Sequence, residues 1–344
     1  MAPEKKSRFE FTVLTNIDHK GSLGASNGGR MKRITIHAIL IVALSFFYEY
    51  PAAAQSTTLH VGFNGFYGAA PLYVAQDAGI FRKHGLTLEL VFIAGGSLST
   101  QALIGKSLDL LQTGGPPFLN AYLRGARLKI IGGVTNILPY VLITGSRITR
   151  SEQLRGKKIG ISRFGSNTDF VVRLALGILG LTPADATILQ VGGSQSRLAA
   201  LKAGTIDATV LSPEEALAAQ KVGLNPLLDF VAKGVEFPHV NIVARDEYLQ
   251  TQAPIVRRFM AAYLEGIRFF KTHKEEAVRK MMALSRLNDR QIAEKAFDVY
   301  SRSLPDDGRP TIKGLEAVLA EFAREDPKAK GLTVAQIVDL SFLP

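Results

Sequence analysis

The sequence of 344 residues contains 41 Lys and Arg against 30 Asp and Glu, and it has no cysteine. The absence of cysteine excludes disulfides, thiolate nucleophiles and cysteine metal sites within the chain. The charged residues are spread along the sequence, which is typical of a solvated surface and at most favours anionic ligands, so we do not expect a nucleic-acid-binding protein.

Residues 31–54 have the pattern of an export signal, and a further 30 residues precede them. Lys32-Arg33 is a positive start, residues 34–47 are mostly apolar but too few to span a bilayer comfortably, and Ala52-Ala53-Ala54 matches a small-residue cleavage site. We therefore expect residues 31–54 to be a cleaved signal peptide. Residues 1–30 are expected to be an upstream extension or a mis-assigned start, outside the fold in either case.

The mature chain is predicted to begin at Gln55 and to be free in the periplasm, because it has no N-terminal cysteine for lipid attachment. Its length suits one large or two medium domains. The histidines of this part are far apart and never at His-x-x-x-His spacing, so we expect no metal site. They are His60, His84, His239 and His273.

The first half of the mature chain repeats its own pattern about 98 positions later. Residues 61–68 (VGFNGFYG) lie over 159–165 (IGISRFG), and residues 94–110 lie over 191–208, which aligns one Gly-Gly-Ser with another. Each copy reads as strand, glycine-bearing loop, helix, strand, Gly-Gly-Ser loop, helix, turn, strand and helix. This alternation predicts two α/β lobes, each with a mostly parallel sheet flanked by helices.

Local signals place the elements of the first copy. Pro71 suits the first turn of a helix and Gly79 its end, and Ser97 or Ser99 can cap the next helix. The proline pair 116–117 can start a further helix. Strands are expected at 86–93 and 108–113.

The second copy has the same signals, and helices follow it. Residues 166–168 are good caps, and Ser212-Pro213 opens a helix after a strand at 208–213. Apolar residues at helical spacing predict helices over 253–270, 288–303 and 311–325, which we expect to brace the first lobe. Extended stretches at 140–146 and 239–245 are expected to form a paired hinge. The predicted lobes are 55–144 with 242–344, and 145–241.

Open α/β sheets bind ligands at the carboxyl ends of their strands, so four loops should face the gap between the lobes. Unpaired backbone N–H groups at helix starts there suit a carboxylate, sulfonate or phosphate, and aromatic side chains can form a wall. Glu214 and Glu215 are interpreted mainly as residues that a helix N-terminus favours. The predicted ligand-binding residues are Asn64, Phe66, Tyr67, Gly96, Ser97, Gly114, Gly115, Arg163, Ser166, Asn167, Thr168 and Ser212.

Sequence motifs for catalysis are absent. Gly62, Gly65 and Gly68 are spaced G-x-x-G-x-x-G, which fails the dinucleotide fingerprint, and residues 103–107 (LIGKS) lack the earlier glycine of a phosphate-binding loop. No G-x-S-x-G occurs, and no paired carboxylates stand in the candidate loops. We expect no cofactor and no enzyme activity.

Residues 113–121 (TGGPPFLNA), 154–170 (LRGKKIGISRFGSNTDF) and 201–219 (LKAGTIDATVLSPEEALAA) resemble the periplasmic substrate-binding proteins of ABC importers for nitrate, sulfonates, taurine and thiamine-precursor pyrimidines. The resemblance covers essentially all of 57–344. It implies a periplasmic binding protein of type II: a two-lobed clamshell, monomeric, that closes on a small solute and docks to a permease in the inner membrane. Its binding positions fall on Gly114-Gly115 and Ser166-Asn167.

The chain departs from the sulfonate binders of that family at Leu211-Ser212-Pro213, where they tend to carry Trp-Asp-Pro. Ser212 offers a neutral hydrogen bond, while Phe66 and Tyr67 would accept a larger, flat molecule such as an aromatic carboxylate or a pyrimidine. The expected function is therefore solute binding for import, with an anionic or aromatic solute. Two alternatives stay open: an enzyme on the same scaffold, related to pyrimidine-precursor synthases or desulfinases, and a periplasmic ligand sensor.

Overall fold

The computed structural model describes residues 56–286 and 288–344. The predicted signal peptide, 31–54, and the upstream extension, 1–30, lie outside the described residues. From residue 55 onward the chain forms one compact unit. This unit contains two five-stranded sheets.

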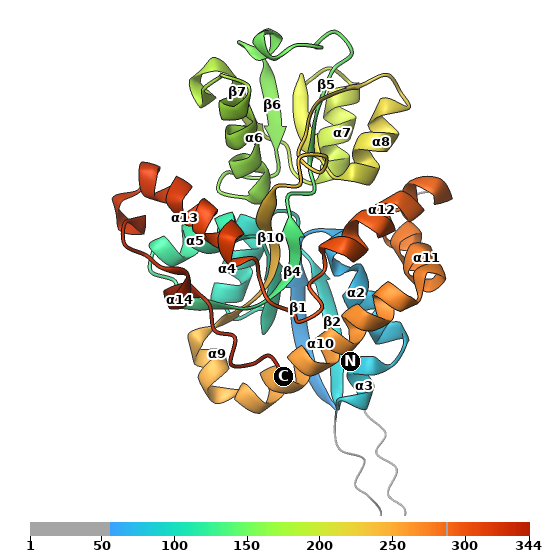
Figure 1. Ribbon diagram of the computed structural model, residues 1–344, viewed down its shortest axis with the longest axis vertical. Coiled ribbons are helices and arrows are strands. Elements are labelled where there is room, and N and C mark those ends of the chain that lie inside the picture. Colours follow the sequence, from blue (N-terminus) through green and yellow to red (C-terminus); the bar gives the residue numbers. More distant parts are fainter. Residues whose placement is uncertain (1–55, 287) are drawn as a thin grey trace, which may run out of the picture. The chain divides into compact units, whose positions relative to one another are not determined.

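The first sheet has the strand order β2-β1-β3-β10-β4 (Figure 1). β1 pairs in parallel with β2 and β3, and β10 is antiparallel to both of its neighbours, so one strand runs against the other four. The bounds are β1 (Thr57–Phe63), β2 (Leu86–Phe92), β3 (Leu110–Thr113), β4 (Leu128–Ile137) and β10 (Glu236–Arg245).

The second sheet has the order β7-β6-β8-β5-β9, with β5 as its antiparallel strand. Both sheets are therefore mixed, and each keeps the mostly parallel arrangement that the sequence predicts. The bounds are β5 (Val141–Thr144), β6 (Lys158–Ile161), β7 (Thr187–Gln190), β8 (Ala208–Leu211) and β9 (Asn225–Asp229).

We call the first sheet with its helices lobe 1 and the second sheet with its helices lobe 2. Lobe 2 has α6 (Asn167–Ile178), α7 (Ser194–Lys202) and α8 (Pro213–Gln220), and short 3-10 turns at Ser151–Leu154 and Pro183–Asp185. Lobe 1 has α2 (Phe66–Asp77), α3 (Ile80–Lys83), α4 (Gly96–Ile104), α5 (Gly115–Leu123), α9 (Asp246–Thr251), α10 (Ala253–Thr272), α11 (Lys274–Ser285), α12 (Arg290–Ser303), α13 (Ile312–Glu325), α14 (Val334–Ile337) and a 3-10 turn at Pro327–Ala329.

The helix-start signals were right in lobe 2 and partly wrong in lobe 1. Ser166 caps α6 by accepting from the Asp169 N–H, and α8 begins at Pro213. The prediction that Pro71 starts a helix is wrong, because α2 begins at Phe66 and contains Pro71 in its interior. α4 begins at Gly96, directly after Gly95, so neither Ser97 nor Ser99 is its cap.

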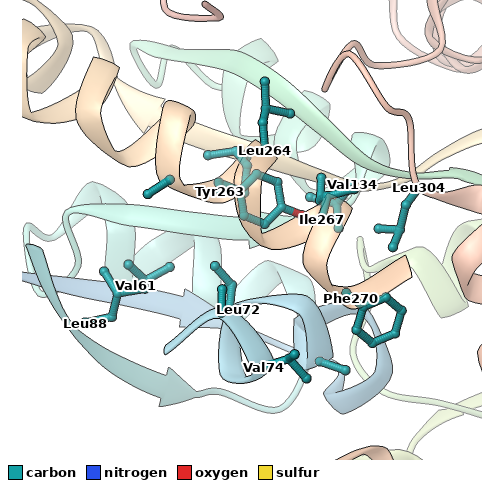
Figure 2. Packing of buried hydrophobic residues seen from close by; sticks show 14 of the residues in the cluster. Val61, Leu72, Val74, Leu88, Val134, Tyr263, Leu264, Ile267, Phe270 and Leu304 are labelled. Atoms are coloured by element: carbon teal, nitrogen blue, oxygen red, sulfur yellow. The ribbon is translucent and has the colours of Figure 1, made fainter. Parts of the chain in front are cut away.

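The core of lobe 1 lies between its sheet and the C-terminal helices. Figure 2 shows Tyr263 and Ile267 of α10 close to Val61 of β1 and Leu72 of α2, all of them buried. Gly266 allows this packing, because a Cβ at that position would lie 2.6 Å from the Ala75 Cβ. The three long predicted C-terminal helices are present as α10, α12 and α13.

A second core joins the two lobes on the side of α5, α6 and α13. Phe170 of α6 packs on Phe237 of β10 and Phe322 of α13, with ring centroids 5.6 and 6.1 Å apart. The buried residues of this cluster come from strands of both sheets, including Leu111 of β3 and Ile159 of β6. Apolar burial on this side therefore favours contact between the lobes.

The predicted repeat is present in the strand pairing. Val61 faces Leu110 between β1 and β3, and Ile159 faces Ala208 between β6 and β8, so both copies have the same register. The predicted lobe boundaries, 144/145 and 241/242, fall at the end of β5 and inside β10. The division 55–144 with 242–344 and 145–241 stays a prediction, as does hinge motion at β5 and β10.

The described helices include none that is both long and apolar enough to cross a membrane.

Candidate functional site

Two of the predicted ligand loops contact each other across the lobes. The Ser97 hydroxyl, at the start of α4 in lobe 1, donates to the Phe164 carbonyl oxygen of lobe 2 at 2.9 Å. The Asn120 side chain of α5 reaches the Gly165 carbonyl oxygen at 3.3 Å. Arg163 is exposed, and its aliphatic part lies over Gly95, where a Cβ would be 3.3 Å from Arg163 Cδ. The loops at 95–97 and 163–165 therefore face one another.

Next to these loops the lobes also meet at Gly114, which precedes α5. A Cβ at position 114 would overlap the side-chain amide of Asn167, at the start of α6. Asn167 Nδ2 donates to the His239 carbonyl oxygen at 2.8 Å and lies 3.3 Å from His239 Nδ1. Burial lowers the pKa of His239 to about 3, so its imidazole is neutral and can accept this bond. The bare backbone of Gly114 is what allows the contact.

A cavity of about 530 Å³ opens beside this contact, between α5, α6 and α13. Its wall includes both polar and apolar groups, with Arg124 and Arg173 near Asp169 and Glu321. Arg173 Nε pairs with Asp169 at 2.9 Å, so one of the two guanidinium groups is already neutralised. The remaining lining residues are Ser97, Asn120, Phe164, Gly165, Ser166, Phe170, Leu174 and Phe322.

A second group of polar side chains is buried where α8 of lobe 2 packs on α12 of lobe 1. Glu214, in the first turn of α8, has only 3 % of its surface exposed, and its Oε2 has no hydrogen-bond partner. The Ser212 hydroxyl lies within bonding distance of Glu214 Oε1 and 2.8 Å from Glu215 Oε2. One hydroxyl proton is therefore placed between two carboxyl groups.

Desolvation raises the pKa of Glu214 to about 8, and repulsion from Glu215 acts in the same direction. Two carboxyl groups that share one site resist double ionisation, because like charges repel. The bond from Ser212 partly opposes this rise. The pair therefore holds a proton at pH values where a solvent-exposed glutamate would have lost it.

Three tyrosines are near enough to Glu214 for its charge to affect their pKa values. Tyr67 of α2 stacks on Tyr300 of α12 with ring centroids 5.4 Å apart, and its hydroxyl is 3.1 Å from the Ser285 hydroxyl. Tyr140, next to β5, meets the His239 ring edge-on at 5.1 Å. Burial raises the pKa of all three phenols, with the negative charge of Glu214 adding to the effect, so they stay neutral.

Arg197 of α7 is a buried cation near Glu215 and Tyr140. Its guanidinium donates to Thr209 Oγ1 at 3.1 Å, to the Gly192 carbonyl oxygen at 2.8 Å and to the Val210 carbonyl oxygen at 3.2 Å. All of these partners are neutral. Burial lowers the pKa of Arg197, while the nearby Glu215 opposes this and favours the charged guanidinium.

Several predicted site residues instead brace the fold. Asn64 Nδ2 donates to Ser99 Oγ at 3.2 Å and to the Gln112 carbonyl oxygen at 3.3 Å within lobe 1. The hydroxyls of Ser162, Ser166 and Thr168 bond one another at about 2.9 Å in a buried network. These bonds fix the loops but leave those groups less free for a ligand.

The remaining predicted residues pack locally. Phe66 stacks on Phe92 with centroids 4.6 Å apart. A Cβ at Gly96 would be 2.7 Å from Pro117 Cγ, and a Cβ at Gly115 would be 2.7 Å from Pro238 Cγ, so both glycines are needed for close packing. Ligand binding by any of the predicted site residues stays a prediction.

Sequence reasoning missed the part of the site that includes Tyr140, His239 and Tyr300. Tyr300 lies in the apolar stripe of a predicted helix, where it is indistinguishable from a core residue. The stretches holding Tyr140 and His239 were recognised only as a hinge. Glu214 and Glu215 were interpreted as residues that the helix N-terminus favours. Two adjacent acidic residues directly after Ser212-Pro213 were the sequence signal that could have indicated a buried carboxyl pair. Within residues 56–286 and 288–344, no group of three His, Asp or Glu side chains could hold a metal ion.

Comparisons with known proteins show the family and the fold of this chain. Residues 68–277 match the family model described as "NMT1/THI5 like". A Brucella abortus protein named as a candidate binding protein is 27 % identical over 255 residues, which cover 72 % of this chain and 77 % of the relative.

Two solved structures are similar over most of the two lobes. The alkanesulfonate-binding protein SsuA of Xanthomonas axonopodis, bound to MOPS, has a TM-score of 0.70 and 21 % identity, covering 83 % of this chain and 99 % of SsuA. The periplasmic nitrate-binding protein NrtA of Synechocystis has a TM-score of 0.58 and 18 % identity, covering 66 % of each chain. These similarities show that the chain has the two-lobed periplasmic binding protein fold.

Proposed function

We propose, from the premise that this chain belongs to the NMT1/THI5-like family, that it is the solute-binding component of an ABC importer. In this proposal the mature chain is exported to the periplasm and binds one small organic solute between its lobes. Closure about β5 and β10 encloses the solute, and the closed form docks to a permease in the inner membrane. The protein acts as a monomer without cofactor.

The contact between Gly114 and Asn167 is the observation that carries this proposal. It brings the start of α5 in lobe 1 against the start of α6 in lobe 2, and it requires a residue without a side chain. A ligand that contacts both helix starts would favour the closed arrangement, because it has different contacts in the open and closed states.

The relatives support a solute-binding role without fixing the solute. SsuA and NrtA are named for alkanesulfonate and nitrate, both anions. The sequence predicts an anionic or an aromatic solute for this chain. The tyrosines at the lobe interface support the aromatic alternative, since flat rings pack well against aromatic side chains.

A thermal-shift screen of the purified mature chain tests the proposal. The screen includes inorganic anions, alkanesulfonates, aromatic acids, aromatic amidines and pyrimidines, each followed by calorimetry. A true ligand at 100 times its Kd should stabilise the folded protein by about 2.7 kcal/mol. A ligand that is consumed during the measurement would favour the enzyme alternative. A screen in which no compound of any class raises the melting temperature would contradict solute binding.

Gly114→Ala is the matched variant for this screen. Its backbone angles, φ −82° and ψ 165°, are ordinary for alanine, so lobe 1 should fold normally. Ligands identified with the natural chain should bind this variant more weakly. Equal binding would exclude the closed arrangement as the ligand-bound state.

A further inference from the structure

The loop 163–165 of lobe 2 takes its shape from side chains of its own lobe. Asp169, in the first turn of α6, accepts from the Gly165 N–H at 2.8 Å, and Gln190, the last residue of β7, accepts from the Phe164 N–H at 2.9 Å. Gly165 has a φ of 74°, which glycine adopts without the penalty that a side chain brings. Neither bond involves lobe 1, so both can hold the loop whether or not the lobes are in contact.

Asp169 is itself held in place. The residue has only 7 % of its surface exposed, and its Oδ1 accepts from Arg173 Nε at 2.9 Å. Its other oxygen, Oδ2, makes the bond to the Gly165 N–H. Because both oxygens are bonded, the carboxylate loses little further side-chain freedom when it positions the loop.

The duplicated fold does not require this arrangement. Ile161 pairs with Gln190 in lobe 2, and Phe63 pairs with Phe92 at the same place in lobe 1. The side chain of Phe92 has no hydrogen-bond acceptor, so lobe 1 has no counterpart of the bond from Gln190. The bonds that order the loop are therefore specific to lobe 2.

The ordered loop directs two carbonyl oxygens at lobe 1. Ser97 donates to the Phe164 carbonyl oxygen at 2.9 Å, and Asn120 donates to the Gly165 carbonyl oxygen at 3.3 Å. The Asn120 amide also donates to the Pro116 carbonyl oxygen at 3.1 Å, which fixes its orientation within lobe 1. Groups that are already ordered lose less conformational entropy when they bond to each other. This contact between the lobes needs no solute.

Another part of the lobe interface is held by charges. Lys221, directly after α8 in lobe 2, pairs with Asp289, the N-cap of α12 in lobe 1, and the Lys221 side chain is 60 % exposed. Exposed ion pairs contribute little to stability and are screened by salt. The donors and acceptors at the loop 163–165 are uncharged, so their bonds should persist at high salt.

We propose that Ser97, Asn120 and the loop 163–165 form a latch that keeps the lobes together before a solute binds, and that Asp169 is the positioning residue of this latch. Most molecules of the solute-free protein are then closed. A solute enters when the latch opens, and its binding stabilises a closed arrangement that the chain already populates. The inference goes beyond the proposed function, because the latch acts on the free protein and its test contains no solute.

Small-angle X-ray scattering of the solute-free mature chain tests the latch. The protein is unfolded in denaturant and refolded by dialysis, which removes any solute carried through purification. We expect the scattering to match the closed arrangement at low salt and equally at about 1 M NaCl, where charges are screened beyond roughly 3 Å. Scattering from separated lobes at either salt concentration would overturn the proposal.

Asp169→Ala, Ser97→Ala and Asn120→Ala each remove part of the latch. Each should raise the ratio of open to closed molecules, obtained from the scattering curves, by about two- to tenfold, the range expected for one lost hydrogen bond. Arg173→Gln is the matched control, because it removes the ion pair of Asp169 and leaves its bond to the loop. Lys221→Gln, which removes the ion pair between the lobes, is the second control, and both controls should change the ratio less than about twofold. Thermal unfolding verifies that all five variants are folded.

A combined variant separates positioning from a general loss of stability. In a chain that already carries Ser97→Ala and Asn120→Ala, adding Asp169→Ala should leave the ratio of open to closed molecules unchanged, because the donors for the loop are gone. A further rise in that background would exclude Asp169 as the positioning residue. Single variants that scatter like the natural chain would exclude the latch itself.

Discussion

Asp109 in lobe 1 and Asp207 in lobe 2 make the same bond at the same place in the repeated unit. Asp109 accepts from the His60 N–H at 2.8 Å, and Asp207 accepts from the Lys158 N–H at 2.8 Å. In both copies the aspartate N–H also donates back to the carbonyl oxygen of that residue, at 2.9 and 2.8 Å. The two copies therefore share the bonds that fix strand ends.

The copies differ at the helix starts that face the lobe interface. In the shared register, Gly114 of lobe 1 corresponds to Ser212 of lobe 2, and Pro116-Pro117 corresponds to Glu214-Glu215. Lobe 1 presents bare backbone and apolar rings, and lobe 2 presents hydroxyl and carboxyl groups. The comparison teaches that the duplicated backbone builds the two walls, while a few unmatched side chains determine what each wall can bind.

The largest expected effect concerns another unmatched pair, Arg197 and its counterpart Ser99. Arg197→Ala removes three hydrogen bonds, to Thr209 Oγ1 and to the Gly192 and Val210 carbonyl oxygens. We expect it to lower the free energy of unfolding by about 3 to 5 kcal/mol, measured by urea denaturation. Ser99→Ala, which removes the bond to the Gly96 carbonyl oxygen and the bond from Asn64 Nδ2, should cost about 1 to 2 kcal/mol. Equal losses would show that the two positions have the same role.

The second effect is a pH dependence of stability that arises from Glu214. The corresponding residues of lobe 1 are Pro116 and Pro117, which do not titrate. The pKa of Glu214 is raised from 4.5 to about 8 in the folded protein, so its contribution to stability is full below pH 4.5 and is lost as the pH rises through 8. Relative to Glu214→Gln, the natural chain should lose on the order of 2 to 4 kcal/mol between pH 5 and pH 8.5.

Denaturant unfolding of both proteins across this range measures the difference directly. The comparison with the variant is needed because His239 also makes stability depend on pH. Its pKa is lowered to about 3, so its contribution to the free energy of unfolding is lost as the pH falls from 6.5 towards 3, the opposite direction to that of Glu214. That contribution is common to both proteins and cancels. Parallel pH profiles for the natural chain and the variant would contradict a raised pKa at Glu214.

The third prediction concerns Gly114, the residue without a side chain at the start of α5 in lobe 1. Gly114→Ala should weaken ligand binding about ten- to a hundredfold, which is 1.4 to 2.8 kcal/mol, because its Cβ collides with Asn167 only when the lobes are together. Calorimetry gives the affinity, and circular dichroism verifies that the variant is folded. In the Asn167→Ala background the same glycine change should have little effect. A loss that persists in that background would place the clash elsewhere.

The smallest effects are expected where the copies agree. Asp109→Ala and Asp207→Ala each remove one bond to a backbone N–H, and Asp109→Ala also removes a 3.3 Å contact with the exposed His60 ring; each should lower the free energy of unfolding by about 1 kcal/mol. Urea denaturation of the two variants measures both values. A difference larger than about 1 kcal/mol between them would show that the shared bond is not equivalent in the two lobes.

Most of the backbone was predictable from the sequence, because repetition and turn chemistry are local. The shift that aligned residues 61–68 with 159–165 also aligns the strand registers, and Ser166 and Pro213 mark helix starts as expected. The prediction that Pro71 lies in the first turn of a helix was wrong. Proline usually occupies that turn, but Pro71 lies in the buried interior of α2.

The side chains of the site were less predictable, because they meet through contacts between distant segments. Tyr67 and Tyr300 stack although 232 residues of other structure separate them, and each alone resembles an ordinary core residue. Glu214 looked like a dipole-favoured helix residue, and only its burial shows that one oxygen has no partner. Burial and pairing are properties of the folded chain, so single-sequence patterns do not contain them.

Phe164 is 49 % exposed at the edge of the lobe contact, where its carbonyl oxygen accepts from Ser97. The chain has no tryptophan and no cysteine of its own. A single indole introduced at this position would therefore be the only tryptophan fluorophore in the protein, and one pair of thiols placed on the two lobes would take up fluorescent dyes at those positions alone. Spectroscopy can thus follow the separation of the lobes in solution with the remainder of the sequence left intact.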